Sequence, residues 1–553
     1  MDRKDLIECK TIPDLLYRSA SMHSQTPFLK FSENGRERCL TYKDFLQEVV
    51  QLASWLTGSG IAYDATAINR NVPTHNPTST KSGIHIALAG RFSYAWILWY
   101  FAILLSGNTV VSMNPDLSED LIRQKMRQTN TCMLAAEGRV LESFHDLAGC
   151  LDIERFSLPE EAETLSLKTL REKINGEKLA MLAFTSGTTG STKVVMLTHD
   201  NLVSDVYCCV QSIGKEFFQA GNVMISFLPA FHMFQVTAGL LAPIWYGMTL
   251  ALVPDIRKLR NSFVRYQPSS MIVVPTILDG LRKMIISSMT GMEKLLMKPV
   301  ARFCQVGAVI GLDLTGLFFR KLHQALGGRM KALICGGAAL DPDLWRWFKN
   351  AGVTVLTGYG STECSPVIAC SRKGHVKAGS VGFVEIVSKN YRSVRIRNGE
   401  LYVKGKIVSK GYYGDPDQTR EVFQDGWFKT GDRAYIDSDG YLFIKGRINS
   451  MLILRNGNNV SAEAAEEGLM RFDEIQSALV YKSINNENVE ADVYLNGTVS
   501  QERLSEILEK YNAEVPPSQC LLQLNVVNND FSRTALGKIK RYLYLAEDGR
   551  KKL

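Results

Sequence analysis

The sequence lacks any apolar run long enough to cross a membrane as a helix. Its longest one, Tyr94 to Leu105, falls short of the roughly 20 residues that a spanning helix needs, so it predicts a buried helix. The segment Met1 to Asp5, with four charged residues, precedes no apolar segment, which predicts that no secretory signal is present. We therefore expect a cytoplasmic protein without a transmembrane segment, and peripheral contact with a membrane surface stays open.

The 11 cysteines lack C-x-x-C spacing, which argues against a zinc site or a disulfide framework and favours reduced thiols in the cytosol. A dominant block of one charge is also missing, because 64 Lys and Arg residues stand against 56 Asp and Glu residues. The net charge of +8 fits an anionic small-molecule substrate, or weak attraction to a membrane, better than a nucleic acid. We expect no nucleic-acid partner.

What is present is the pattern of a large globular protein. A chain of 553 residues with 45% hydrophobic residues can form two to four domains. Strand and helix patterns alternate from residue 84 onward, which predicts an α/β fold. Beyond Arg447 the pattern becomes that of a small α+β unit. We predict a large N-terminal α/β domain of several subdomains over 1–447 and a small, mobile C-terminal α+β domain over 448–553.

A loop of glycine and hydroxyl residues over 185–193 lies between two predicted strands, 179–184 and 194–197. Backbone amides and hydroxyls of such a loop can approach a polyphosphate closely, and Lys193 adds positive charge. A Walker P-loop is excluded, because that motif has glycine directly before its lysine and Ser or Thr directly after it. The loop predicts phosphate binding of another design, and a plain surface turn is the alternative from this stretch alone.

Polar side chains follow three later strand patterns. His232 lies between aromatic residues after a strand over 223–227, where packing is a simpler explanation than catalysis. Glu363 follows glycine and hydroxyl residues after a strand over 353–356, which suits a magnesium site shared with phosphate oxygens. Asp432 is expected to be exposed after a Thr-Gly turn, where it can accept two hydrogen bonds from a ribose diol; ordinary turn chemistry is the alternative.

Five segments, in this order, resemble signatures of the adenylate-forming (acyl-AMP-forming) superfamily, and the resemblance covers nearly the whole chain. The segments are 185–193, 359–363, 430–432, 446–447 and 534–538. Further likeness over 318–340 and 456–460 is closest to bacterial medium- and long-chain fatty acyl-CoA synthetases. The family implies two half-reactions: a carboxylate attacks the α-phosphorus of ATP to give acyl-AMP and pyrophosphate, and a thiol, usually of coenzyme A, then displaces AMP.

The resemblance implies a role for each matching position. The residues implied to hold the nucleotide are Thr185, Ser186, Gly187, Thr188, Thr189, Gly190, Lys193, Gly337, Ala338, Tyr359 and Gly360. Glu363 is implied to bind Mg²⁺ and Thr362 to bind the α-phosphate. Asp432 and Arg447 are implied to hold the ribose. Lys538, from the C-terminal domain, is implied to be catalytic by bridging the attacking carboxylate and the α-phosphate.

In the second half-reaction, the acceptor thiol must take the position that Lys538 occupies in the first half-reaction. The resemblance implies that the C-terminal domain rotates about a hinge after Arg447, so that Gly457 borders the pantetheine tunnel. The chain departs from the family pattern at Thr192, Val194, Asn449, Ser450, Ala462 and Ser532. None of these positions is a charged group assigned to catalysis, so they bear on rates and hinge preference more than on the reaction.

The acyl substrate is expected beside the run that begins at Phe231. Amino-acid-activating members have an Asp just after this aromatic residue, whereas this run has no carboxylate, and an unpaired buried ammonium is costly. The residues implied to line the acyl pocket are Phe231, Met233, Phe234, Val236, Ala238 and Gly239. His232 is implied to act as a gate or as a neighbour of the carboxylate. We predict a medium- to long-chain fatty acid, and an aryl acid stays open.

Two alternatives to a coenzyme A ligase are open. The first keeps the adenylation and transfers the acyl group to the pantetheine thiol of an acyl carrier protein. The second is a non-catalytic sensor of acyl-AMP or nucleotide. The charged residues that argue together against a sensor are Lys193, Glu363, Asp432, Arg447 and Lys538.

Overall fold

The computed structural model describes most of the chain. The described residues are 9–33, 35–58, 83–144, 149–159, 163–185, 193–213, 217–287, 319–372, 374–384, 388–448, 451–454, 459–483, 488–533 and 539–546, with the single positions 289, 291, 299, 549 and 551. They form two compact units. The first unit contains the described residues of Met1–Thr185, Val194–Ser393 and Val403–Phe428, and the second unit contains those of Ser186–Lys193, Val394–Tyr402 and Lys429–Leu553.

The first unit contains a six-stranded sheet with the order β6-β5-β3-β4-β7-β8. Its strands are β3 (His85–Ala89), β4 (Thr109–Met113), β5 (Thr131–Ala136), β6 (Cys150–Asp152), β7 (Leu179–Thr185) and β8 (Lys193–Thr198). The pairings of β3 with β4 and β5, of β4 with β7 and of β5 with β6 are parallel. Since parallel strands need crossover connections, helices separate most of them along the chain.

The helices of this region are α2 (Ile12–Met22), α3 (Tyr42–Gly58), α5 (Tyr94–Leu105), α6 (Glu119–Gln128), α7 (Gly138–Leu141), α8 (Leu167–Arg171) and α9 (His199–Ile213). Helix α5 has the bounds predicted from its apolar run, and it begins where the Ser93 side chain accepts a hydrogen bond from the Trp96 amide. Nine of its residues are buried, including both tryptophans. The run is therefore a core helix, and no helix in the described residues is long and apolar enough to cross a membrane.

A second sheet of the first unit has eight strands in the order β14-β13-β12-β11-β9-β10-β1-β2. They are β1 (Pro27–Glu33), β2 (Arg36–Thr41), β9 (Val223–Ser226), β10 (Thr249–Leu252), β11 (Ser270–Val273), β12 (Ala332–Cys335), β13 (Thr354–Gly360) and β14 (Val367–Cys370). The pairings from β1 through β10, β9, β11 and β12 to β13 are parallel, whereas β2 and β14 are antiparallel edge strands. The predicted strand over 353–356 extends further, through Gly360.

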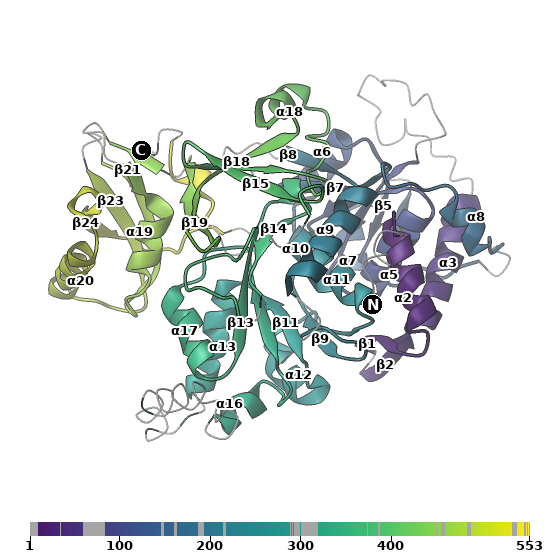
Figure 1. Ribbon diagram of the computed structural model, residues 1–553, viewed down its shortest axis with the longest axis horizontal. Helices are drawn as coiled ribbons and strands as arrows, with labels where there is room; N and C mark the ends of the chain where they lie inside the picture. The colour runs from purple at the N-terminus through teal and green to yellow at the C-terminus, as the bar shows by residue number, and fades with distance from the viewer. Residues whose placement is uncertain are drawn as a thin grey trace. The chain divides into compact units, whose positions relative to one another are not determined.

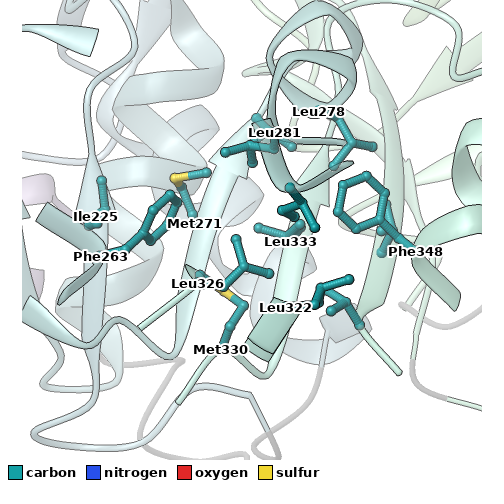
Figure 2. Close-up of a cluster of buried hydrophobic side chains, with 14 of the residues drawn as sticks. Ile225, Phe263, Met271, Leu278, Leu281, Leu322, Leu326, Met330, Leu333 and Phe348 are labelled. Atoms are coloured by element: carbon teal, nitrogen blue, oxygen red, sulfur yellow. The ribbon is translucent and has the colours of Figure 1, made fainter. Parts of the chain in front are cut away.

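One face of this sheet is covered by α12 (Leu259–Tyr266), α13 (Pro275–Ser287), α16 (Arg320–Ala325) and α17 (Pro342–Asn350). Figure 2 shows the core between these helices and β11 and β12, with Met271 and Leu333 from the strands facing Leu281 and Phe348 from the helices. At about 25 cal/mol per Å² of apolar area, such burial is the main stabilising term. It fixes the positions of the strand ends.

The other short elements of the first unit are α10 (Met233–Val236), the π-helical turn η1 (Thr237–Leu241), α11 (Ala242–Trp245), η2 (Ile256–Lys258), η3 (Thr362–Cys364), α18 (Pro416–Val422) and β17 (Phe423–Gln424). Figure 1 shows α10 and α11 beside α9 in the body of this unit. The π-helical turn requires Gly239, because a Cβ there would lie 2.5 Å from Gln235 Nε2 and 2.7 Å from Ile272 Cδ1. Single π-turns of this kind are frequent at functional sites.

The second unit contains two further groups of strands. In the first group β16 (Glu400–Lys404) lies between β15 (Ser393–Arg397) and β18 (Trp427–Ile436), and β19 (Leu442–Arg447) pairs with β18. The second group consists of the pair β20 (Met451–Ile453) with β21 (Asn459–Ser461) and the sheet β22 (Ile475–Lys482), β23 (Val489–Leu495) and β24 (Leu521–Val526). Helices α19 (Ala462–Leu469) and α20 (Gln501–Glu514) bury apolar residues against this sheet, and η5 (Pro517–Gln519) and η6 (Arg541–Leu543) are short turns. The predicted α+β character beyond Arg447 is observed.

Candidate active site

Three loops with predicted site residues meet at one edge of the eight-stranded sheet. The parallel strands β9, β12 and β13 end there, and Phe231, Gly336 and Tyr359 lie in or directly after these ends. The Phe234 ring packs on the backbone of Gly336, since a Cβ on that glycine would lie 3.1 Å from Phe234 Cζ. The structure thus joins the predicted acyl run to the predicted adenine segment. Ligands of open α/β sheets bind at this kind of edge.

The predicted nucleotide residues at this edge differ in exposure. Gly337 and Ala338 are exposed after β12, and Gly337 has a φ of +84°, which glycine adopts without strain. Tyr359 is partly exposed at the end of β13, and Gly360 after it is exposed. Backbone and ring surfaces are therefore available to a ligand. Thr362, in the following turn η3, is also partly exposed.

The Glu363 side chain is held through both of its oxygens. The Tyr412 hydroxyl donates to Glu363 Oε1 at 2.9 Å, and the Ser361 hydroxyl donates to Glu363 Oε2. The main-chain carbonyl of Glu363 accepts from the Ser409 amide at 2.9 Å. Only 9% of the residue is exposed. Its carboxylate therefore has one defined orientation.

The donor set at Glu363 fits a magnesium ion carried by a nucleotide. An ionised carboxylate has about four acceptor positions, so two hydroxyl donors leave capacity for a metal. Among the described residues, no group of three or more His, Cys, Asp and Glu side chains could hold a metal. Mg²⁺ is commonly bound by one or two carboxylates, with phosphate and water completing its coordination. A single fixed carboxylate is what such a site requires.

The acyl run after β9 is mostly buried. Met233, Val236, Ala238 and Gly239 are buried, whereas Phe231 and Phe234 are partly exposed. The Thr237 hydroxyl within this run donates to the Ser365 carbonyl at 2.8 Å. The same short segment thus provides apolar surface and contacts the turn that follows Glu363.

His232 is a neutral imidazole in this environment. Burial lowers the pKa of His232 to about 4. Its ring packs on Phe231 with a centroid distance of 4.4 Å, and its Nε2 has no hydrogen-bond partner among the described residues. A buried polar atom without a partner is costly, so a ligand atom at this position would be stabilised. This fits the predicted place of His232 beside a substrate carboxylate.

The glycine and hydroxyl loop lies largely outside the described residues. Thr185 ends β7 and Lys193 begins β8, both partly exposed, whereas 186–192 is not described. Lys125 Nζ lies 3.8 Å from the centroid of the Phe184 ring, and burial lowers the pKa of Lys125 to about 8. Sequence patterns gave no signal for Lys125, because its contact joins α6 to a strand 59 positions later in the chain.

The prediction that Asp432 is exposed after a turn is wrong. Asp432 lies inside β18, where it faces Arg447 of β19, and only 4% of it is exposed. Arg447 Nε lies 2.9 Å from Asp432 Oδ1, and Arg447 Nη1 donates to the Thr430 carbonyl at 2.9 Å. The antiparallel register brings the two residues together and lets the arginine cover the carboxylate. The two predicted ribose residues are thus direct neighbours.

Three predicted features of the second unit fall outside the described residues: Lys538, Gly457 and the hinge positions Asn449 and Ser450. The chain on both sides of Lys538 is described, and Arg533 and Ile539 form an antiparallel bridge there. The roles predicted for these residues stay predictions.

Sequence reasoning missed Tyr412 and Asp205. Tyr412 belongs to a Gly-Tyr-Tyr-Gly segment, where a pair of aromatic residues between two glycines was the available signal. Asp205 lies in α9, and its Oδ1 accepts from the Val367 amide at 3.1 Å. A carboxylate on the buried face of an amphipathic helix was the available signal for it.

Comparison with known proteins agrees with this geometry. Residues 79–413 match the family described as AMP-binding enzyme. The long-chain-fatty-acid–CoA ligase FadD15 of Mycobacterium bovis is 28% identical over 432 residues, which are 72% of this chain and 71% of that protein. The chloroplastic long-chain-fatty-acid–[acyl-carrier-protein] ligase AEE15 of Arabidopsis thaliana is 25% identical over 86% of this chain and 75% of that protein.

Solved structures show the same fold at lower identity. The anthranilate CoA ligase AuaEII, in complex with anthranoyl-AMP, has a TM-score of 0.73 and 19% identity, with 96% of each chain covered. A fatty acyl CoA synthetase of Mycobacterium tuberculosis has a TM-score of 0.63 and 19% identity, with 97% of each chain covered. These matches confirm the predicted α/β fold, and with the family match over 79–413 they place the chain in the AMP-binding enzyme family.

Proposed function

We propose that this enzyme activates a medium- to long-chain fatty acid with ATP and transfers the acyl group to coenzyme A. The supporting observation is the mostly buried and largely apolar run 231–239, which has no carboxylate and which packs through Phe234 on Gly336. Relatives named as long-chain-fatty-acid–CoA ligases support the same substrate class. A buried apolar surface next to a nucleotide segment suits a fatty acyl chain whose carboxylate reacts with ATP.

In the first half-reaction two anions must approach each other, so charge neutralisation and alignment are the main catalytic problem. Glu363 would hold Mg²⁺, which supplies positive charge to the phosphate oxygens. Thr362 would bind the α-phosphate, and the neutral His232 would orient the substrate carboxylate. Lys538 would neutralise the attacking carboxylate and the α-phosphate together.

The remaining nucleotide contacts are also proposals. The loop of Thr185, Ser186, Gly187, Thr188, Thr189, Gly190 and Lys193 would hold the departing pyrophosphate. Gly337, Ala338, Tyr359 and Gly360 would line the adenine. Asp432 and Arg447 would hold the ribose. The C-terminal domain over 448–553 would then rotate, and Gly457 would border the path of the coenzyme A thiol.

A second acceptor is favoured by one relative. The Arabidopsis protein, which covers more of this chain than FadD15 does, is named as an acyl-carrier-protein ligase. Transfer to a carrier-protein pantetheine uses the same adenylate and the same thiol chemistry, so this enzyme could use either acceptor.

A pyrophosphate-release screen tests the proposal. Fatty acids from C4 to C18 and aryl acids would be compared, with coenzyme A and with pantetheinylated acyl carrier protein as acceptors. We expect turnover with C8 or longer fatty acids and coenzyme A. The variant Lys538→Ala should lose adenylation and keep thioester formation from supplied acyl-AMP. Turnover with aryl or short acids alone would overturn the substrate class, and no pyrophosphate release from any acid would revive the sensor.

A further inference from the structure

The Tyr412 segment connects strand β8 to Glu363 within the first unit. Its main chain pairs with β8, the strand after the glycine and hydroxyl loop. The Tyr413 amide donates to the Val194 carbonyl at 2.8 Å, the Met196 amide to the Gly411 carbonyl at 3.0 Å, and the Lys410 amide to the Met196 carbonyl at 3.1 Å. The position of Tyr412 along β8 is therefore fixed.

The same segment reaches Glu363 in two places. The Ser409 amide donates to the Glu363 carbonyl, and the Tyr412 hydroxyl donates to Glu363 Oε1, both at 2.9 Å. One contact holds the main chain and the other holds the side chain. Tyr412 is itself buried, with its ring packed edge-on against Phe423 at 5.7 Å. Because the ring is packed on Phe423, the Tyr412 side chain is restricted to one rotamer, and its hydroxyl has a defined position.

We propose that Tyr412 is a positioning residue for the Mg²⁺ ligand Glu363. Its hydroxyl holds one carboxylate oxygen, and its backbone ties that carboxylate to the strand that follows the phosphate loop. The metal ligand and strand β8 then keep a fixed spacing within the first unit. This inference rests on the proposed role of Glu363.

Hydrogen bonds that orient a metal ligand are worth about 10- to 100-fold in metal affinity or activity. In Tyr412→Phe the ring and its contact with Phe423 stay, and only the hydroxyl is lost. We expect this variant to bind Mg²⁺ with a non-hydrolysable ATP analogue about tenfold more weakly, as measured by calorimetry without any acid substrate. Thioester formation from supplied acyl-AMP should change less than twofold, since no phosphate is transferred in that step.

Tyr413→Phe is the matched control. The Tyr413 hydroxyl accepts from Asn130 Nδ2 at 3.1 Å and its ring packs against His85, so the substitution removes a neighbouring hydroxyl that does not contact Glu363. We expect its affinity for the Mg²⁺ complex to match that of the unaltered enzyme. Melting temperatures without nucleotide should agree within about 2 °C among the three proteins, which excludes general loss of structure.

Two outcomes separate the inference from the function on which it rests. Equal affinities of Tyr412→Phe and Tyr413→Phe for the Mg²⁺ complex would overturn the positioning role, even if the unaltered enzyme activates fatty acids. Conversely, a tenfold loss in Tyr412→Phe alone would support the positioning role, even if no fatty acid is turned over. A loss of affinity without Mg²⁺ that equals the loss with it would also overturn the inference, because the effect would then not involve the metal.

Discussion

Both units of this enzyme contain a buried carboxyl group near an arginine, Asp205 in the first unit and Glu466 in the second, but the two arrangements differ. In the second unit Glu466 contacts Arg541 directly and accepts from the Val480 amide at 2.7 Å. In the first unit Asp205 accepts from the Val367 amide, whereas the nitrogens of Arg392 have no hydrogen-bond partner among the described residues.

Burial raises the pKa of both carboxyl groups, Glu466 and Asp205. It raises the pKa of Glu466 to about 7, and Arg541 opposes the shift. It raises the pKa of Asp205 well above its usual value, and Arg392 opposes the shift there. An arginine in direct contact keeps a buried glutamate partly ionised at neutral pH. Arg392, which makes no hydrogen bond among the described residues, opposes the rise in the pKa of Asp205 without a direct ion pair.

The largest expected effect is the loss of the contacting arginine. Arg541→Met leaves Glu466 buried without its cation, which should cost about 3–5 kcal/mol in the second unit. Hydrogen exchange of the α19 and β22 amides measures this loss locally. Arg392→Met removes a guanidinium that is only 1% exposed and that has no hydrogen-bond partner in the described part of the chain, so the variant should lose no stability or gain some. An equal loss of stability in both variants would contradict the inference that Arg541 stabilises its carboxyl partner and Arg392 does not.

The next largest effect is a pH dependence of the stability of the second unit, which we attribute to Glu466. Between about pH 4.5 and 7 the folded protein holds this proton and the unfolded chain does not, so stability falls as pH rises through this window. The full change is about 3 kcal/mol, because one pKa unit corresponds to about 1.4 kcal/mol. Unfolding of the second unit at pH 5 and pH 8 measures it, and Glu466→Gln should remove the difference. An unchanged slope in this variant would contradict the pKa of about 7.

The smallest effects concern Asp205. Asp205→Ala leaves the buried Val367 amide without its acceptor, which should cost about 1–3 kcal/mol. Asp205→Asn keeps an acceptor of the same shape for the Val367 amide, so it should cost less than about 1 kcal/mol. Thermal unfolding of the two variants compares them. If Asn costs as much as Ala, the carboxyl is ionised and its charge, rather than its shape, is what the fold uses.

Local features of the fold could be predicted from the sequence. Helix α5 has the bounds that its apolar run predicts. At the start of α3, the Thr41 hydroxyl accepts from the Asp44 amide at 3.2 Å, which is the contact that an N-cap threonine makes. These elements depend on neighbouring residues only. The position of Glu363 after a strand end was predictable for the same reason, although the strand continues to Gly360.

The contacts between distant segments could not be predicted. Tyr412 lies 49 residues from Glu363, and neither residue type indicates the other as its partner. Asp432 is buried only because the register of β18 and β19 sets it opposite Arg447. Strand register depends on turns and packing along both strands, so a Thr-Gly pair in the sequence looked like a surface turn.

Strand β1 pairs with β10, so during synthesis β1 stays unpaired on this side until β10 has been made. The Thr249 hydroxyl donates to the Pro27 carbonyl at 2.7 Å across 222 residues. At a ribosomal rate of about 5–20 residues per second, β1 is made roughly 10–45 seconds before this partner. Its hairpin with β2 covers one edge, while Leu29, which is buried in the finished fold, stays without its partner Leu250 of β10. During this interval the unpaired edge of β1 is open to edge-to-edge pairing with another chain.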